Sequence, residues 1–243
     1  LNDDALYSLG NSFVKGNKNQ KAMEAYDLLL KNYPKSVYKS KTLLRQGLVY
    51  YNDGENEKAL KKYKTITKNF PYTEEANQAI TSAKLIYIED GKVNEYAAWI
   101  KTLDYASISN IELDNTTYAA AEKQYIDGKT KRAIDLFRDY LTQFPRGMHV
   151  IKAKFYLAEI HYAEQNFSQA LPNYKVVINA PKGEFTEQAL LHINEIYLNS
   201  KKWNNAIVYL EKLERAAENP QNKLYAQSNL MNAFYETQSF NKA

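Results

Sequence analysis

Several residue types are missing or rare in this chain of 243 residues. There is no cysteine, so disulfide bonds, thiol catalysis and cysteine-ligated zinc are excluded. Glycine and proline contribute only 8 and 6 residues, which argues against disorder and against turn-rich all-β folds. No apolar run approaches the length of about 18 residues that a transmembrane helix needs, so no membrane span is predicted. Tyrosine, by contrast, is abundant at 21 residues, and it suits half-buried positions on helix faces and binding surfaces.

Charge and histidine content narrow the function further. The 32 basic and 28 acidic residues give a net charge of +4, a mixed surface too mildly basic to indicate a nucleic-acid partner. The three histidines include no pair with the four-residue spacing by which one helix binds zinc. No glycines form a phosphate loop, and no serine has the context of a nucleophile elbow. The sequence therefore predicts no catalytic residue, no metal site, no cofactor and no enzyme.

One register position recurs along the whole chain. Its members lie 37, 37, 37, 37, 36 and 37 residues apart, and they are Ala22, Ala59, Tyr96, Ala133, Ala170, Ala206 and Ala243. A fixed period of this length indicates an array of one supersecondary unit rather than a domain with a single core. Because the units of an array contact mainly their neighbours, function is expected on long surfaces rather than in a central pocket.

The first unit predicts a pair of helices joined by a turn. Apolar residues follow a helical period over 6–13 and again over 22–33. The polar segment 16–20 separates the two helices and begins with Gly16, a residue typical of helix C-termini. Pro34 cannot continue the second helix, and Ser36 is expected to cap the helix that follows.

Further positions recur in the same register. Nine residues before it stand Phe13, Tyr50, Tyr87, Gln124, His161, Tyr197 and Phe234, and four residues after it stand Tyr26, Tyr63, Ile100, Phe137, Tyr174 and Leu210. Twelve residues before it stand the small residues Gly10, Gly47, Ala121 and Ala158, and twelve residues after it stand Pro34, Pro71 and Pro145. This spacing of small residue, aromatic, alanine, aromatic and proline resembles the tetratricopeptide repeat. The resemblance implies an all-α fold in which antiparallel helix pairs stack into a right-handed solenoid.

The domain prediction is a single solenoid over 1–243 with about six and a half repeats. Their boundaries are expected near 3–38, 39–75, 76–112, 113–149, 150–185, 186–222 and 223–243, the last being a half repeat. The third repeat departs most from the pattern, because Tyr96 replaces alanine, Lys84 replaces a small residue and Ile108 replaces proline. Its spacing is kept, so we interpret it as a repeat whose packing has drifted.

A lysine-rich stretch lies on the second helix of the second repeat. It spans residues 58–68 and contains Lys58, Lys61, Lys62, Lys64 and Lys68. No matching basic stripe runs through the other repeats, so a solvated helix face explains the stretch better than a nucleic-acid or lipid patch.

The candidate binding surface is a stripe on the first helices of repeats four to six. The resemblance implies that first helices line a concave groove that holds ligands. Positions 15, 11 and 8 residues before the register are spaced i, i+4, i+7 and share one helix face. They are Tyr118, Glu122, Tyr125, Phe155, Glu159, Tyr162, Leu191, Glu195 and Leu198.

We hypothesise that Glu122, Glu159 and Glu195 form an acidic ladder within an aromatic groove. Such a groove suits a segment that carries Lys, Arg or backbone N–H donors, with the rings supplying contact area. In the alternative interpretation, the rings pack against adjacent first helices and the glutamates keep the inner face soluble.

The functional prediction is a non-catalytic scaffold that binds a protein or peptide segment, in particular a basic one, in this groove. A narrower alternative follows from the long repeats with aromatic–proline ends, which resemble bacterial tetratricopeptide proteins of the cell envelope, including those of outer-membrane assembly and the Tol–Pal system. That resemblance implies a periplasmic or outer-membrane-associated protein. A third alternative is the recruiting or regulatory arm of a larger enzyme or signalling protein. Because the chain begins at Leu1 without a signal-like apolar stretch, a longer parent chain is expected.

Overall fold

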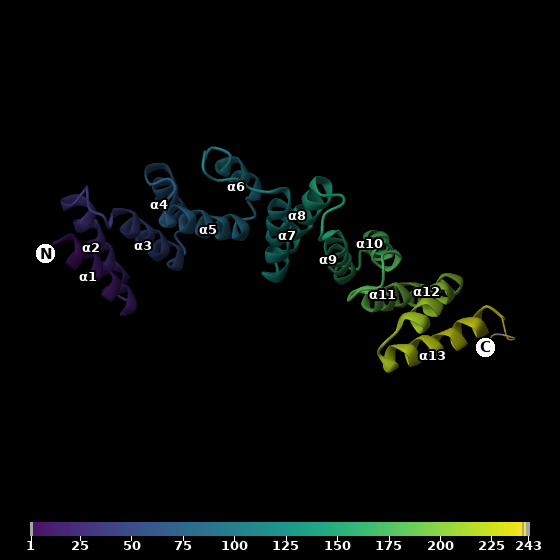
Figure 1. Cartoon of the computed structure of the whole chain (residues 1–243). Coiled ribbons are helices and arrows are strands. Elements are labelled where there is room, and N and C mark those ends of the chain that lie inside the picture. The colour runs from purple at the N-terminus through teal and green to yellow at the C-terminus, as the bar shows by residue number, and fades with distance from the viewer. Residues whose placement is uncertain (1, 240, 242–243) are drawn as a thin grey trace. The chain divides into compact units, whose positions relative to one another are not determined.

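The computed structural model describes residues 2–239 and 241, and Ala243 of the recurring register lies outside them. The described residues form thirteen α-helices and no strand, so the all-α repeat fold is confirmed (Figure 1). The helices are α1 (Asp3–Lys15), α2 (Asn19–Asn32), α3 (Lys39–Asn52), α4 (Asn56–Asn69), α5 (Glu74–Glu89), α6 (Val93–Ile100), α7 (Asn110–Ile126), α8 (Thr130–Gln143), α9 (Val150–Ala163), α10 (Phe167–Asn179), α11 (Thr186–Asn199), α12 (Trp203–Ala216) and α13 (Pro220–Glu236).

The chain divides into two compact units. The N-terminal unit, residues 1–120, holds α1 to α6 and most of α7, and the C-terminal unit, residues 121–243, holds the end of α7 and α8 to α13. The sequence predicts one continuous solenoid that includes both units, and this continuity stays a prediction. Within the described part of the chain, no helix is both long enough and apolar enough to cross a membrane.

Every helix pair turns through the same backbone conformation. The residue five before the register position has a positive φ in each repeat, and these residues are Asn17, Gly54, Gly91, Gly128, Gln165, Lys201 and Gln238. The residue after each one donates its N–H to the carbonyl five residues back, at 2.8 or 2.9 Å. This is the Schellman ending of a helix, in which one left-handed residue lets the chain reverse. Glycine adopts that conformation freely, whereas the larger side chains in four of the turns do so at a cost of about 1–2 kcal/mol.

Small residues let the paired helices approach closely. The register alanines of the regular repeats are fully buried, at 0% exposure for Ala22, Ala59, Ala133, Ala170 and Ala206. A Cβ atom on Gly10 would clash with the Tyr26 ring, and one on Gly47 would clash with the Tyr63 ring. Each ring therefore lies directly on the backbone of the first helix.

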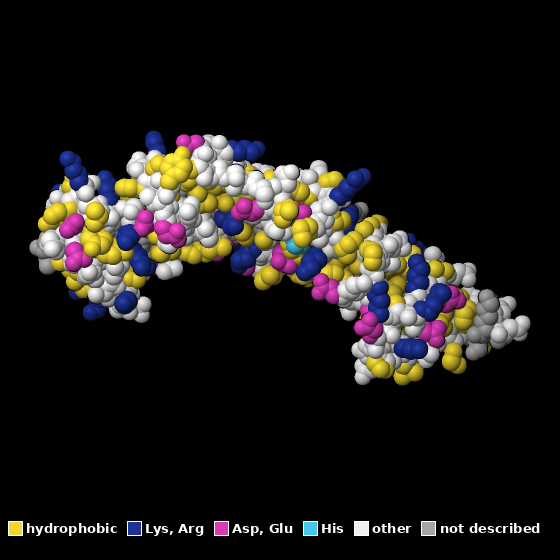
Figure 2. Space-filling model, viewed as in Figure 1, with side chains coloured by type: hydrophobic (Ala, Val, Ile, Leu, Met, Phe, Trp, Pro, Cys, Tyr) yellow, Lys and Arg dark blue, Asp and Glu magenta, His cyan; other side chains and the backbone are white. Residues whose placement is uncertain are grey.

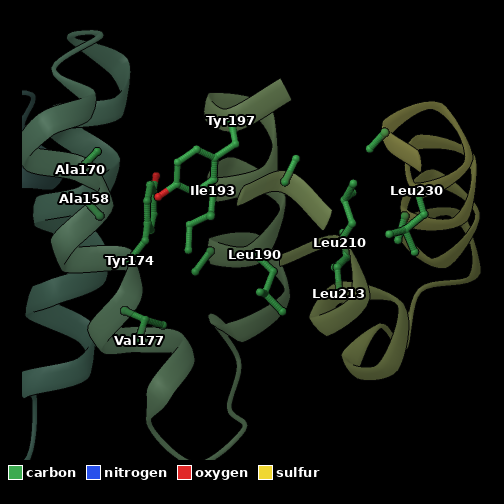
Figure 3. Close-up of a cluster of buried hydrophobic side chains, with 14 of the residues drawn as sticks. Ala158, Ala170, Tyr174, Val177, Leu190, Ile193, Tyr197, Leu210, Leu213 and Leu230 are labelled. Atoms are coloured by element: carbon green, nitrogen blue, oxygen red, sulfur yellow. The ribbon is translucent and has the colours of Figure 1, made fainter. Parts of the chain in front are cut away.

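The hydrophobic core of the C-terminal unit continues this packing from one repeat to the next. Ala158 and Ala170 lie between α9 and α10, and the Tyr174 ring extends from α10 toward α11 (Figure 3). Beyond α11, Leu210 and Leu213 of α12 face Leu230 of α13 (Figure 3). Each helix pair is thus stabilised by apolar burial against its neighbours, as expected for an array.

The start of α3 differs from the sequence-based expectation. Tyr38 occupies its N-cap position and makes no side-chain capping bond. Ser36 instead donates to Asp3 Oδ2 at 2.7 Å and accepts the Tyr38 N–H at 3.0 Å. The predicted Ser36 cap is wrong, because residues 36–39 form a turn of their own in which the Lys39 N–H donates to the Ser36 carbonyl.

Three helices, α5, α7 and α13, begin slightly before the predicted repeat boundaries at 76, 113 and 223. Helix α5 begins at Glu74, because the Thr73 side chain accepts the Ala76 N–H as an N-cap. Helix α13 begins at Pro220, behind the Asn219 cap. Proline suits the first turn of a helix, where its missing N–H costs nothing.

The third repeat keeps its helix pair but has a short second helix. Helix α6 has 8 residues, whereas α4 has 14. Tyr96, at the alanine position, is 2% exposed and packs with Tyr87 and Trp99, at centroid distances of 5.9 and 6.2 Å. Lys84, at the small-residue position, forms an ion pair with Glu112 at 3.1 Å. Aromatic packing and an ion pair thus replace the small-residue contact of the regular repeats.

Candidate partner-binding surface

The predicted stripe occupies three helices. Tyr118, Glu122 and Tyr125 come from α7, Phe155, Glu159 and Tyr162 from α9, and Leu191, Glu195 and Leu198 from α11. Tyr118 belongs to the N-terminal unit, and the other eight residues belong to the C-terminal unit. Tyr118 and Phe155 are only 4% and 7% exposed, so these two rings are packed inside the protein. The other seven side chains are half-buried.

Part of the aromatic stripe takes part in ring packing. Phe155 stacks on Phe185, with ring centroids 4.4 Å apart. Tyr125 lies beside Tyr156, with centroids 4.8 Å apart. The Tyr125 contact joins α7 to α9, as the packing alternative expects, and the Phe155 contact joins α9 to the N-cap residue of α11. Half-burial leaves part of Tyr125 accessible.

Glu159 is held by the buried tyrosine of its own repeat. The Tyr174 hydroxyl donates to Glu159 Oε1 at 2.5 Å. Burial of Tyr174, and then its hydrogen bond to this carboxylate, raise the pKa of the phenol far above its usual range. The hydroxyl therefore keeps its proton and remains a donor. The first repeat has a neutral version of this contact, in which the Tyr26 hydroxyl donates to Asn11 Oδ1 at 2.8 Å.

Glu195 is held from two sides. The Tyr162 hydroxyl donates to Glu195 Oε2 at 2.6 Å, and His192 Nδ1 lies 2.9 Å from the same oxygen. Burial and the Glu195 carboxylate raise the pKa of Tyr162 above its usual range. Because Tyr162 lies on α9 and Glu195 on α11, the bond between them joins the first helices of neighbouring repeats, whereas the His192 contact lies within α11.

His192 lies between the two carboxylates. Its Nε2 atom is 3.4 Å from Glu159 Oε1, and its ring centroid is 4.1 Å from that of Tyr162. Burial lowers the pKa of His192, but the hydrogen bonds and charges of Glu159 and Glu195 outweigh it, so the net pKa is raised above 6.5. We call Glu159, Tyr162, Tyr174, His192 and Glu195 the Tyr–Glu–His cluster.

The predicted stripe does not include His192 or Tyr174, so sequence reasoning missed two members of this cluster. Signals for both were present. His192 lies three residues before Glu195, which places both on one helix face. Tyr174 lies 15 residues after Glu159, the same separation as between Asn11 and Tyr26.

The cluster leaves hydrogen-bonding capacity on both carboxylates. Glu159 uses Oε1 and Glu195 uses Oε2, and no described residue donates to the other oxygen of either group. A carboxylate oriented in this way can accept hydrogen bonds from Lys, Arg or backbone N–H groups. Within the residues that the structure describes, no set of three or more His, Asp or Glu side chains is arranged to hold a metal ion.

Comparison with known families identifies the repeat. The model of the tetratricopeptide repeat matches residues 4–36 and 41–71, which correspond to the α1–α2 and α3–α4 pairs. The chain therefore contains tetratricopeptide repeats. The Schellman turns and buried alanines that define these two tetratricopeptide repeats recur in the later helix pairs.

Several solved structures are similar to this tetratricopeptide-repeat protein. PilF from Pseudomonas aeruginosa is 14% identical, covers 93% of this chain and 96% of its own, and has a TM-score of 0.41. A tetratricopeptide repeat protein from Parabacteroides merdae is 17% identical over 96% and 84% of the two chains, with a TM-score of 0.38. The yeast Sti1 domain solved in a pHSP90 complex is 14% identical over 97% and 98%, also with a TM-score of 0.38. Among curated proteins no sequence matches the chain.

Proposed function

We propose that this protein is a non-catalytic scaffold that binds a protein or peptide segment on the first-helix face of its C-terminal unit. Proteins built from tetratricopeptide repeats generally act as scaffolds rather than as enzymes. The proposed partner carries Lys or Arg side chains, which Glu122, Glu159 and Glu195 receive. One observation carries the proposal: Glu159 and Glu195 are oriented by tyrosine hydroxyls, and each keeps one oxygen for a partner.

The physical chemistry of the cluster favours a basic segment. A carboxylate that is already oriented loses little conformational freedom on binding, and charge-assisted hydrogen bonds to Lys or Arg are stronger than neutral ones. The half-buried rings of Tyr125 and Tyr162 offer contact area beside the carboxylates. His192 opposes a cation when it is protonated, so binding should strengthen as the pH rises through its raised pKa.

A peptide array tests this proposal. The fluorescently labelled protein is applied to arrays of Lys- and Arg-rich, neutral and acidic peptides, and bound peptides are then titrated by fluorescence anisotropy. The test variant is E122Q/E159Q/E195Q, which keeps hydrogen-bond acceptors and removes charge. We expect the basic peptides to bind best and the variant to lose about tenfold or more in affinity, increasingly so at low salt.

The matched control is D135N/D139N/E211Q. It removes the same charge from exposed positions on the second helices α8 and α12 and should leave affinity nearly unchanged. If the glutamine variant binds basic peptides as the unsubstituted protein does, the first-helix face is not the binding surface. If both variants weaken binding equally, the effect comes from total charge and the proposal fails.

An envelope role is the second candidate. It is favoured by the repeat length of 36 or 37 residues with aromatic–proline ends, which resembles tetratricopeptide proteins of the bacterial envelope. We propose a periplasmic or outer-membrane-associated assembly factor as this narrower function. Fractionation of cells that express the full natural gene product tests it, and recovery in the cytosolic fraction would reject it.

A further inference from the structure

The third repeat opens a hollow on the second-helix side of the N-terminal unit. Helix α6 has only 8 residues and lies next to α4, which has 14 (Figure 1). Between them lies a hollow of about 630 Å³, lined along α4 from Glu57 to Asn69 and closed by Tyr87 of α5. A second hollow of about 600 Å³ follows toward the end of α6 and shares Lys64 and Lys68 with the first. The two together form one trough, which we call the α4–α6 trough.

The far end of the α4–α6 trough is fixed by a hydrogen bond. The Tyr105 hydroxyl donates to the Thr67 carbonyl at 2.8 Å, which ties the segment after α6 to the end of α4. Tyr72 lies beside Tyr105, with centroids 5.1 Å apart, and is 73% exposed. Hydrophobic side chains are exposed between the end of α4 and α6 (Figure 2). The trough is therefore bounded by packed residues rather than by a loose loop.

Lysines on one face of α4 give the middle of the trough its charge. Lys61, Lys64 and Lys68 are exposed and line it, and their spacing puts them on one side of the helix. None of the three forms an ion pair with a described residue. The Lys64 ammonium instead lies 5.7 Å from the centroids of both Tyr87 and Trp99. The prediction of a solvated lysine face thus misses that these lysines border a hollow with aromatic walls.

Acidic residues stand only at the ends of the trough. Glu57 and Glu95 line the end where both helices begin, and Asp104 lines the opposite end. A short acidic segment can lie over the three lysines between these ends, whereas a long phosphodiester backbone would pass over the carboxylates and be repelled. A combined volume of this size suits several side chains rather than a single small anion.

We infer that the α4–α6 trough is a docking site for a short acidic peptide segment that carries an aromatic residue. Lys61, Lys64 and Lys68 bind its carboxylates, and the half-buried Trp99 ring contacts its aromatic side chain. The site lies in the N-terminal unit on second helices, so it is separate from the first-helix surface proposed above and does not depend on it.

Fluorescence anisotropy with three labelled probes tests the inference. The probes are a peptide of Asp and Glu around one Tyr, the same peptide with Asn and Gln, and a single-stranded oligothymidylate. We expect the acidic peptide to bind at least about tenfold more tightly than the other two, with affinity falling as salt is raised. Equal binding of the neutral peptide, or tighter binding of the oligonucleotide, would overturn the inference.

Matched variants locate the binding. K61Q/K64Q/K68Q should weaken acidic-peptide binding by about tenfold or more. K18Q/K21Q/K35Q removes the same charge from exposed lysines elsewhere in the N-terminal unit and should bind as the unsubstituted protein does. Unchanged affinity in the first variant, or equal loss in both, would show that the trough is not the site.

Trp99 provides a direct optical readout. The chain has two tryptophans, so W203F leaves Trp99 as the only one. Acidic peptide should then change the Trp99 emission with the same midpoint as the anisotropy titration. Emission that stays constant while anisotropy saturates would place the peptide elsewhere.

Discussion

The third repeat, in the N-terminal unit, and the fifth repeat, in the C-terminal unit, have the same helix-pair architecture. They differ in which helix of the pair borders the candidate surface. In the fifth repeat, Ala158 and Ala170 bring α9 and α10 together, and the polar chemistry lies on the first helix, around Glu159. In the third repeat, Lys84 and Tyr96 occupy the corresponding positions, α6 is short, and the α4–α6 trough opens on the second-helix side. In the regularly packed fifth repeat the polar groups described above lie on the first-helix face. The irregular packing of the third repeat opens the second-helix face instead.

The two surfaces also differ in the sign of their charge. Glu159 and Glu195 of the C-terminal unit are held by tyrosine and histidine, whereas the trough lysines Lys61, Lys64 and Lys68 form no ion pair with a described residue. We therefore propose that one chain has separate docking surfaces for a basic segment and for an acidic segment. The following predictions test this comparison, beginning with the largest expected effect.

Restoring the common alanine in the third repeat should destabilise it. Tyr96→Ala removes a buried ring that packs with Tyr87 and Trp99, and the cavity left behind should cost about 3–5 kcal/mol. Urea unfolding followed by circular dichroism measures this loss. If the Tyr96→Ala protein is as stable as the unsubstituted one, the third repeat can adopt the packing of the regular repeats.

Placing a large side chain at the alanine position of a regular repeat should also destabilise the protein, but by less. Ala133 is fully buried, so Ala133→Leu overpacks the helix interface and should lower the free energy of unfolding by about 1–3 kcal/mol. Thermal and urea unfolding give the value. An unchanged melting temperature would contradict the assigned helix register, and Asp135→Leu on the exposed side of α8 serves as the control.

The hydroxyl groups of Tyr174 and Tyr26, which occupy the same register position, should contribute unequally to the free energy of unfolding. Tyr174→Phe breaks a hydrogen bond to a carboxylate and should cost about 2 kcal/mol, whereas Tyr26→Phe breaks one to the neutral Asn11 and should cost about 1 kcal/mol. Both variants keep the buried ring. Equal losses in urea unfolding would show that the charge of Glu159 adds nothing to the contact.

His192 should make the C-terminal unit slightly less stable as the pH rises. Its pKa is raised above 6.5 in the folded state, so its stabilising effect is fully present below that value and is lost as the pH rises through the folded pKa. Glu159, Glu195, Tyr162, Tyr174 and Gln188 surround the ring.

The corresponding variant is His192→Gln. Urea unfolding at about pH 5.5 and about pH 8.5 should show a difference between the two proteins of no more than about 1 kcal/mol, larger at the lower pH. Identical pH profiles for the two proteins would exclude His192 as the titrating group.

Much of the fold could be predicted from the sequence because packing repeats with a fixed period. Each described register residue lies on the second helix of its pair, and Gly10 and Gly47 were correctly expected where helices approach closely. Ser36 was wrongly expected to cap α3, because a cap depends on local backbone angles that several residues decide together.

The candidate surface was predicted only in part. The stripe spacing placed Glu159 and Glu195 on first helices, but spacing along one helix does not show which side chains of other helices reach them. The contacts of Tyr174 and His192 therefore required the structure, as did the burial of Tyr118 and Phe155. The α4–α6 trough was missed for another reason: it arises from the length of α6, which the retained register of the third repeat conceals.

The Schellman turns have a consequence for how the chain folds. Each turn brings residues of two adjacent helices together across a few intervening positions, and most native contacts form between segments close in sequence. Chains with such low contact order fold quickly, and an array can begin folding at any repeat. The turns at Gly54, Gly91 and Gly128 reach their left-handed conformation without steric cost, whereas those at Gln165 and Lys201 do not. The left-handed turn therefore costs least in the second, third and fourth helix pairs, and we expect folding to begin more readily there than in the fifth and sixth.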